Sequence, residues 1–264
     1  MYQFLSPLFM AISLMTRLPV ARWLPDQWAD KSLGQSALWY PFVGFLLSVL
    51  LVVISSILDL ASPAVNAAVV LAMWVGFTGA LHLDGLADCV DAMFASHSAH
   101  PSEDMSCPKK QTILRVLKDP SVGAMGAVTL VVLLLLKFCL LAELLDTFWL
   151  ALFVALILSR TCALLFIVTT PYTPHSSQQG LGFVLAKYTS KPIAFVVAGG
   201  AALLAFVVLP LFDALLVSGV LAAILLLWRA YWIKRLDGFV GDAIGALIEL
   251  SEVAVLFVIY SVSV

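Results

Sequence analysis

Three aspartates, Asp84, Asp88 and Asp91, lie close together in the stretch HLDGLADCVDAMF. On a helix, this i, i+4, i+7 spacing places the three side chains on one face, within about 60° of one another. Like charges on one face destabilise a helix unless something offsets them. A divalent cation would do so, and Mg²⁺ prefers oxygen ligands. The spacing therefore predicts Asp84, Asp88 and Asp91 as metal ligands, with a solvated helix end as the alternative.

A second acidic group, Asp242, Glu249 and Glu252, lies near the C-terminus in the stretch GDAIGALIELSE. Asp242 and Glu249 are seven residues apart and share a helix face. Both glutamates fall inside an apolar segment, where an ionised group is costly and commonly functional. We predict catalytic roles for all three acids. The alternative for the glutamates is a structural pairing with Arg160 or Lys137, which also lie in apolar segments.

A third group lies in the stretch VLKDPSVGAMG. Asp119 followed by Pro120 is typical of a helix N-terminus. Such an N-terminus favours phosphate, and Lys118 adds a positive charge beside it. The alternative is that Asp119 only caps the helix. The residues predicted to contact substrate are Lys118, Asp119, His82, Gly123 and Gly241, where a lone histidine is more often structural and the glycines leave backbone accessible.

Carboxylates, a lysine and glycine-rich helix ends indicate metal-assisted transfer at phosphorus. Bound metal would stabilise the attacking and leaving oxygens. One acid could accept the proton of an attacking hydroxyl.

The elements that must position these residues are membrane helices. The 264-residue chain is 62% hydrophobic and 11% charged, whereas soluble domains carry about 25% charged residues. A bilayer core requires roughly 20 apolar residues per helix. We therefore expect an all-α, polytopic membrane helix bundle, one domain over 1–264, with a short interfacial or re-entrant N-terminal helix. The seven expected spans are 37–58, 62–82, 123–145, 148–170, 192–212, 214–232 and 244–263.

Short connections without lysine or arginine alternate with longer, basic connections between these spans. All but Lys137, Arg160 and Arg229 of the 14 lysines and arginines fall in the N-terminal region or in three longer connections. The positive-inside rule then places the N-terminus and these connections in the cytoplasm and the C-terminus outside. The expected cytoplasmic loops are 83–122, 171–191 and 233–243, so all three chemical groups lie at one membrane face.

These motifs, in this order, give the sequence a specific resemblance. It resembles the cobalamin synthase family, the adenosylcobinamide-GDP ribazoletransferases of cobamide synthesis, over nearly its whole length. The segments that carry the resemblance are TRLPV, WYPFVGFLLS, GALHLDGLADCVDAMF, KDPSVGAMG, QGLGF and GFVGDAIGALIELSE.

The resemblance implies a Mg²⁺-dependent enzyme of the bacterial inner membrane with a cytoplasmic active site and a periplasmic C-terminus. It implies that a hydroxyl of α-ribazole, or of its 5'-phosphate, attacks adenosylcobinamide-GDP and releases GMP. Adenosylcobalamin or its 5'-phosphate is then the product. Expected partners are these substrates, membrane lipid and, by association, other enzymes of the corrinoid pathway; no nucleic acid is expected.

Two other classes remain open at the level of sequence. A CDP-alcohol phosphotransferase would use similar aspartates, but its DG-x-x-A-R signature is absent, because the residue after Asp84-Gly85-Leu86-Ala87 is an acid, Asp88. A secondary transporter would place charges near the bilayer midplane within broken helices. Here most of the acids gather toward one face.

Overall fold

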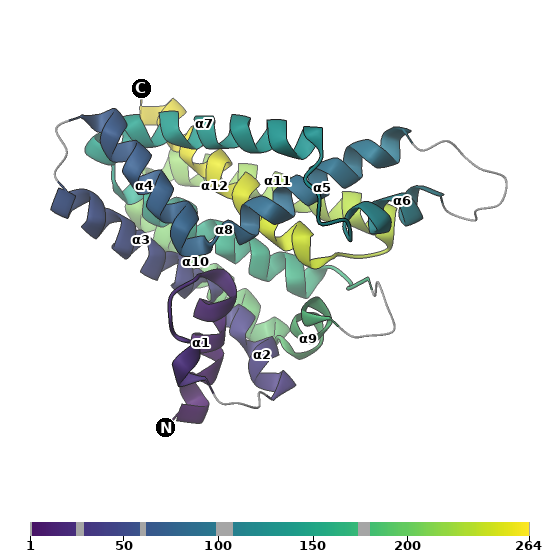
Figure 1. Cartoon of the computed structure of the whole chain (residues 1–264). Coiled ribbons are helices and arrows are strands. Elements are labelled where there is room, and N and C mark those ends of the chain that lie inside the picture. Colours follow the sequence, from purple (N-terminus) through teal and green to yellow (C-terminus); the bar gives the residue numbers. More distant parts are fainter. Residues whose placement is uncertain (1, 25–28, 59–61, 99–107, 174–179, 264) are drawn as a thin grey trace.

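The protein is a bundle of helices that cross one another at varied angles (Figure 1). The computed structural model describes residues 2–24, 29–58, 62–98, 108–173 and 180–263. Within these ranges the regular elements are helices, and the one β-type pairing is an isolated bridge between Tyr172 and Phe239. The predicted all-α membrane bundle is confirmed.

Six helical segments of the described chain are long and apolar enough to cross a bilayer. The first is a continuous run, Asp30–Leu58, made of α2 (Asp30–Ser36), a short 3-10 turn (Ala37–Trp39) and α3 (Tyr40–Leu58). The others are α7 (Ala124–Thr147), α8 (Leu150–Thr169), α10 (Lys191–Val208), α11 (Leu211–Leu236) and α12 (Gly241–Ser263). Each coincides with a predicted span to within a few residues, apart from the α2 extension.

The helix observed at the expected span 62–82 is shorter than that span. Helix α4 (Pro63–Thr78) ends at Gly79, whose left-handed backbone (φ 61°) closes the helix with its N–H bonded to the Gly76 carbonyl. Helix α5 (Leu81–Ser98) then leaves at 84° to α4. We treat α4 as the seventh membrane segment, and α5 as the arm outside it that carries the three aspartates.

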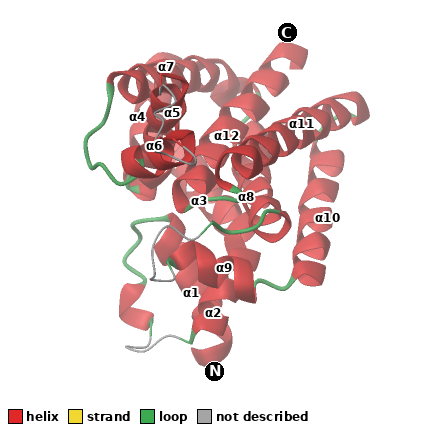
Figure 2. Ribbon diagram, turned by 90° about the vertical axis from the view of Figure 1, so that its right-hand side faces the viewer, coloured by secondary structure: helices red, strands yellow, loops and turns green. Residues whose placement is uncertain are grey.

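Two helices form the centre of the bundle. In α8, 89% of the apolar window is buried within the protein, and in α12 72%, against 17% in α10 and 22% in α11. Helix α8 packs against α3, α10 and α12, and α12 packs against α5. Figure 2 shows α10 and α11 along one side of the molecule. Polar groups on α8 and α12 are therefore enclosed by protein rather than lipid.

The remaining helices lie at the ends of the spans. Helix α1 (Tyr2–Met15) is too short to count as a span and packs against α2 and α3. The segments expected as cytoplasmic loops are largely helical: α5 and α6 (Pro108–Val116) occupy most of 83–122, and α9 (Leu181–Tyr188) lies in 171–191. Residues 99–107 and 174–179 of those segments lie outside the described chain.

Candidate active site

The three aspartates of the first motif lie on α5, as the spacing predicted. Asp84 is exposed, and Asp88 and Asp91 are half-buried. The pKa of Asp88 is raised to about 6, first because burial disfavours its charged form and then because of the carboxylates of Asp84, Asp242 and Asp91. The four acids are thus close enough to repel one another, although Asp242 is far away in sequence.

Two glycines bring Asp242 to the aspartates of α5. A Cβ atom on Gly85 would lie 2.8 Å from the backbone oxygen of Asp242, and one on Gly245 would lie 3.1 Å from the Cα atom of His82. Helices α5 and α12 therefore cross backbone to backbone at these positions. The crossing places Asp242, in the first turn of α12, beside the helix face that carries Asp84 and Asp88.

Asp91 makes a contact of a different kind. Its carboxylate accepts hydrogen bonds from the backbone N–H groups of Gly123 (2.8 Å) and Gly126 (2.9 Å) at the start of α7. A Cβ atom on either glycine would lie 2.5 Å or less from an Asp91 oxygen. Asp91 is thus the cap of α7, supplied by another helix. This contact gives Asp91 a structural role, and its role as a metal ligand stays a prediction.

The helix N-terminus predicted from Asp119 and Pro120 is wrong, whereas the predicted span 123–145 begins within one residue of α7. Helix α7 begins at Ala124 with Gly123 as its N-cap. Asp119 lies in the preceding turn, where it accepts hydrogen bonds from the backbone N–H (3.0 Å) and the hydroxyl (2.6 Å) of Ser121. These bonds hold the pKa of Asp119 below its usual value. Lys118, next to it, is also exposed.

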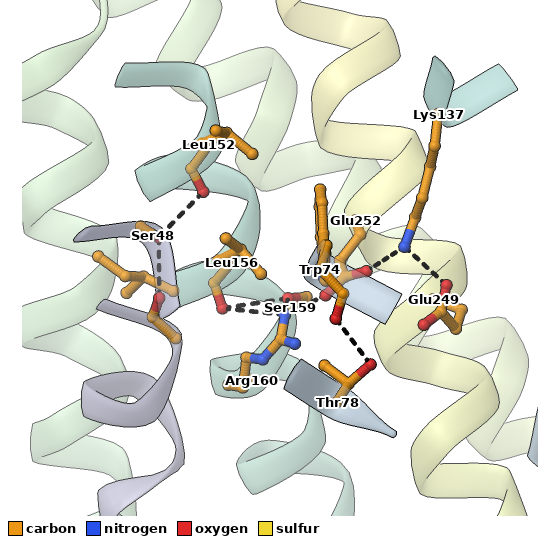
Figure 3. A network of polar contacts seen from close by, with 12 residues as sticks. Ser48, Trp74, Thr78, Lys137, Leu152, Leu156, Ser159, Arg160, Glu249 and Glu252 are labelled. Atoms are coloured by element: carbon orange, nitrogen blue, oxygen red, sulfur yellow. Dashed lines mark hydrogen bonds and ion pairs between the residues drawn. The ribbon is translucent and has the colours of Figure 1, made fainter. Parts of the chain in front are cut away.

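The two glutamates of α12 belong to a buried ion-pair network (Figure 3). Lys137 of α7 pairs with Glu249 at 2.7 Å and also with Glu252. Arg160 of α8 pairs with Glu252 and donates to the Ser159 hydroxyl at 2.9 Å. The structural pairing considered from sequence is therefore present, and the two positive and two negative charges balance.

This network lies deeper in the bundle than the aspartates. All four charged side chains are at most 3% exposed. The ammonium group of Lys137 also lies 4.3 Å from the ring centre of Trp74 on α4. Three spans and α4 are thus joined at one point. The catalytic role predicted for Glu249 and Glu252 stays a prediction, whereas their role in holding these helices together is visible.

The remaining predicted contacts lie close to the crossing of α5 and α12. His82 is buried against Gly245, and its Nδ1 atom has no hydrogen-bond partner within the described chain. Gly241 is exposed and opens α12 immediately before Asp242. Both residues therefore lie within one turn of an acidic residue of the candidate site.

Sequence reasoning missed two contacts near this site. Asp237, in a left-handed conformation after α11, forms an ion pair with Lys110 of α6. Tyr172 and Phe239 pair through their backbones and place their ring centres 5.6 Å apart. Neither contact has a local signal, because each joins segments more than sixty residues apart.

The donor types at the crossing suit Mg²⁺. Among the described residues no group of three or more histidine, cysteine or acidic side chains is placed to hold a metal ion. Mg²⁺ is, however, usually held by one or two carboxylates together with substrate phosphates and water. The carboxylates of Asp84, Asp88 and Asp242 therefore fit a magnesium ion that arrives with a diphosphate.

Comparison with known proteins shows the family of the chain. The family model described as cobalamin-5-phosphate synthase matches residues 7–260. Proteins named adenosylcobinamide-GDP ribazoletransferase are 38% identical in Stutzerimonas stutzeri (95% of this chain, 96% of the relative) and 38% in Pseudomonas aeruginosa (97% and 98%). The protein of that name in Acinetobacter baumannii is 32% identical (96% of each chain). No solved structure matches the chain.

Proposed function

The chain belongs to the cobalamin-5-phosphate synthase family, and from this premise we propose how its residues carry out the family's reaction. It is an adenosylcobinamide-GDP ribazoletransferase, as its relatives are named. It joins the nucleotide loop to the corrinoid and so forms cobalamin or its 5'-phosphate. The observation that carries the proposal is the crossing of α5 and α12, which brings Asp84, Asp88 and Asp242 together.

The reaction is a substitution at phosphorus. A ribose hydroxyl oxygen of α-ribazole, or of its 5'-phosphate, attacks the phosphorus that is attached to cobinamide. A new P–O bond forms, the P–O bond to GMP breaks, and GMP leaves with the bonding electrons. The hydroxyl proton passes to a nearby base. Phosphoryl transfers of this kind depend mainly on positioning and on stabilisation of charge at the phosphate oxygens.

We assign the aspartates at the crossing to these tasks. Asp84 and Asp88 would hold Mg²⁺ together with the diphosphate of the donor, and the ion would stabilise the departing GMP oxygens. Asp242 lies opposite them and would accept the proton of the attacking hydroxyl. Lys118, on the adjoining turn, would contact a phosphate.

Glu249 and Glu252 would act through α12 rather than on the substrate. Each is already paired with Lys137 or Arg160 inside the bundle. Those pairs fix α12 relative to α7 and α8. Since Asp242 is on the same helix, the pairs would also determine where Asp242 lies.

The site would face the cytoplasm from the bacterial inner membrane. Asp84, Asp242 and Lys118 lie in or near the segments that connect the membrane helices on the side where the basic connections lie. The positive-inside rule places such connections in the cytoplasm. Both substrates would then reach the enzyme from the cytoplasm.

The test is GMP release by the purified enzyme in lipid, with both substrates and a titration of Mg²⁺. We expect Asp88→Asn to lower turnover by a factor of about 100 or more, because a metal-bound substitution at phosphorus loses a charged ligand. Asp146→Asn, at an exposed position in the last turn of α7, at the opposite end of that helix from the candidate site, is the control and should be unaffected. Near-normal turnover of Asp88→Asn at saturating Mg²⁺ would contradict the metal assignment.

A further inference from the structure

A cavity separate from the candidate active site lies where the chain passes from the end of α8 to α9 and the start of α10. Its volume is about 440 Å³, which falls in the range of small-molecule sites. Its wall includes Thr170, Tyr172, Phe183, Lys187 and Lys191. Nothing in the proposed mechanism so far uses it.

The cavity is positively charged. Lys187 and Lys191 lie in its wall, and the described lining contains no acidic side chain. Neither lysine forms an ion pair with any described residue. Arg229 of α11 adds a third cation close by, since its Nε atom donates to the carbonyl of Thr169, another wall residue, at 2.9 Å. Such a wall favours an anion.

The cavity also has an aromatic side. The rings of Tyr172 and Phe183 lie edge to face with their centres 6.1 Å apart. The Lys187 ammonium group lies 5.4 Å from the centre of the Phe183 ring. A Cβ atom on Gly182 would lie 2.7 Å from the Tyr172 ring, so the glycine lets that ring lie against α9. Aromatic rings beside cations are suited to a ligand that carries both a flat ring system and a phosphate.

The backbone connects this cavity to the candidate active site. The Phe239 N–H donates to the Pro171 carbonyl at 2.8 Å, and the Thr173 N–H donates to the Phe239 carbonyl at 3.1 Å. Tyr172 thus lies next to Phe239, three residues before Asp242. A ligand held against Tyr172 would lie beside the segment that leads into Asp242.

We propose that this cavity is the subsite for the acceptor nucleotide. Lys187 and Lys191 bind its 5'-phosphate, and Tyr172 and Phe183 receive its aromatic base. The proposal rests on the proposed function and assigns the acceptor a place in the molecule. The corrinoid part of the donor is excluded because it is much larger than the cavity, and tighter binding of GMP than of α-ribazole 5'-phosphate would assign the cavity to the donor's guanine nucleotide instead. A lipid headgroup would share the phosphate, but it offers no flat ring for the two aromatic side chains.

The test is equilibrium binding to the full-length protein in nanodiscs of phosphatidylcholine. The probes are α-ribazole 5'-phosphate and α-ribazole, with GMP for comparison. We expect the double variant Lys187→Gln, Lys191→Gln to bind the 5'-phosphate at least 10-fold more weakly and α-ribazole within 2-fold of wild type. Phe183→Leu should weaken both probes alike. Lys234→Gln, an exposed lysine of α11 outside the cavity lining, is the control and should bind both as wild type does.

Two further results would overturn the proposal. One is a double variant whose affinity for the 5'-phosphate stays within 2-fold of wild type. The other is a double variant that loses affinity only for phosphatidylglycerol vesicles, which would make the cavity a headgroup site. A failure of the proposed function is distinct, because wild type would then release no GMP from adenosylcobinamide-GDP and acceptor, whatever the two lysines bind.

Discussion

At the scale of the residue, the aspartates of α5 divide into two kinds. Asp84 and Asp88 face the start of α12, whereas Asp91 accepts two backbone hydrogen bonds from the start of α7. Their shared helix face, predicted from the spacing in sequence, conceals this division. Both kinds of contact position the site, but only the first leaves carboxylate oxygens for a substrate-bound metal.

A pair of substitutions separates the two roles. Asp91→Ala should lower the free energy of unfolding by about 2 kcal/mol, because two backbone donors lose a charged acceptor. Asp91→Asn should retain part of that stability and keep the wild-type Mg²⁺ requirement for GMP release. Thermal unfolding in detergent and Mg²⁺ titrations measure the two effects. A raised Mg²⁺ requirement in Asp91→Asn, with unchanged stability, would make Asp91 a ligand instead.

At the scale of the element, the crossing of α5 and α12 is the contact on which the site depends. Gly85 permits it because a larger side chain would meet the backbone of Asp242. Asp242 therefore stays close to Asp84 and Asp88 only as long as the backbones of α5 and α12 are in contact.

Gly85→Ala tests this crossing. We expect GMP release to fall at least 10-fold and stability to fall by about 1–3 kcal/mol, since the added methyl group must push α12 away. Gly219→Ala in α11 is the matched control, because nothing lies within 4 Å of a Cβ atom there. Equal activity of the two variants would show that Asp242 does not depend on the crossing.

The buried network makes a second prediction about elements. Lys137→Met should lower the free energy of unfolding by about 3–5 kcal/mol, because it leaves the glutamate charges without one partner. The double variant Lys137→Met, Glu249→Gln restores charge balance and should recover part of that loss. Unfolding of both variants in the same detergent measures the difference. A double variant less stable than Lys137→Met would contradict a role based on charge balance.

At the scale of the whole molecule, the sequence was sufficient for the spans and not for their contacts. Apolar length was sufficient to predict the six spans of the described chain, and a seventh if the bent pair of α4 and α5 is one span, because the bilayer imposes that length on each helix separately. The capping signal predicted at Asp119 and Pro120 was wrong because the carboxylate that caps the first turn of α7, that of Asp91, comes from another helix. The 84° bend after Gly79 and the approach of Asp242 to Gly85 likewise depend on packing between distant segments.

Sidedness is the prediction that belongs to this scale. Seven membrane segments would put the two chain ends on opposite faces, and the positive-inside rule predicts the N-terminus in the cytoplasm. A reporter enzyme that is active only outside the cytoplasm should therefore be active when fused after Val264 and inactive when fused within the α5–α6 connection. Activity at both positions would contradict the proposed orientation.

The buried network also has a consequence for biogenesis. Lys137 and Arg160 are in α7 and α8, whereas both of their counter-charges are in α12, which leaves the ribosome after both of those helices. Until α12 arrives, each cation faces the bilayer at a cost of about 2.5–3.5 kcal/mol. Lys137 and Arg160 of the nascent chain therefore have no counter-charge in the membrane until α12 inserts. Chains truncated before α12 should accordingly be substrates for membrane proteases rather than stable intermediates.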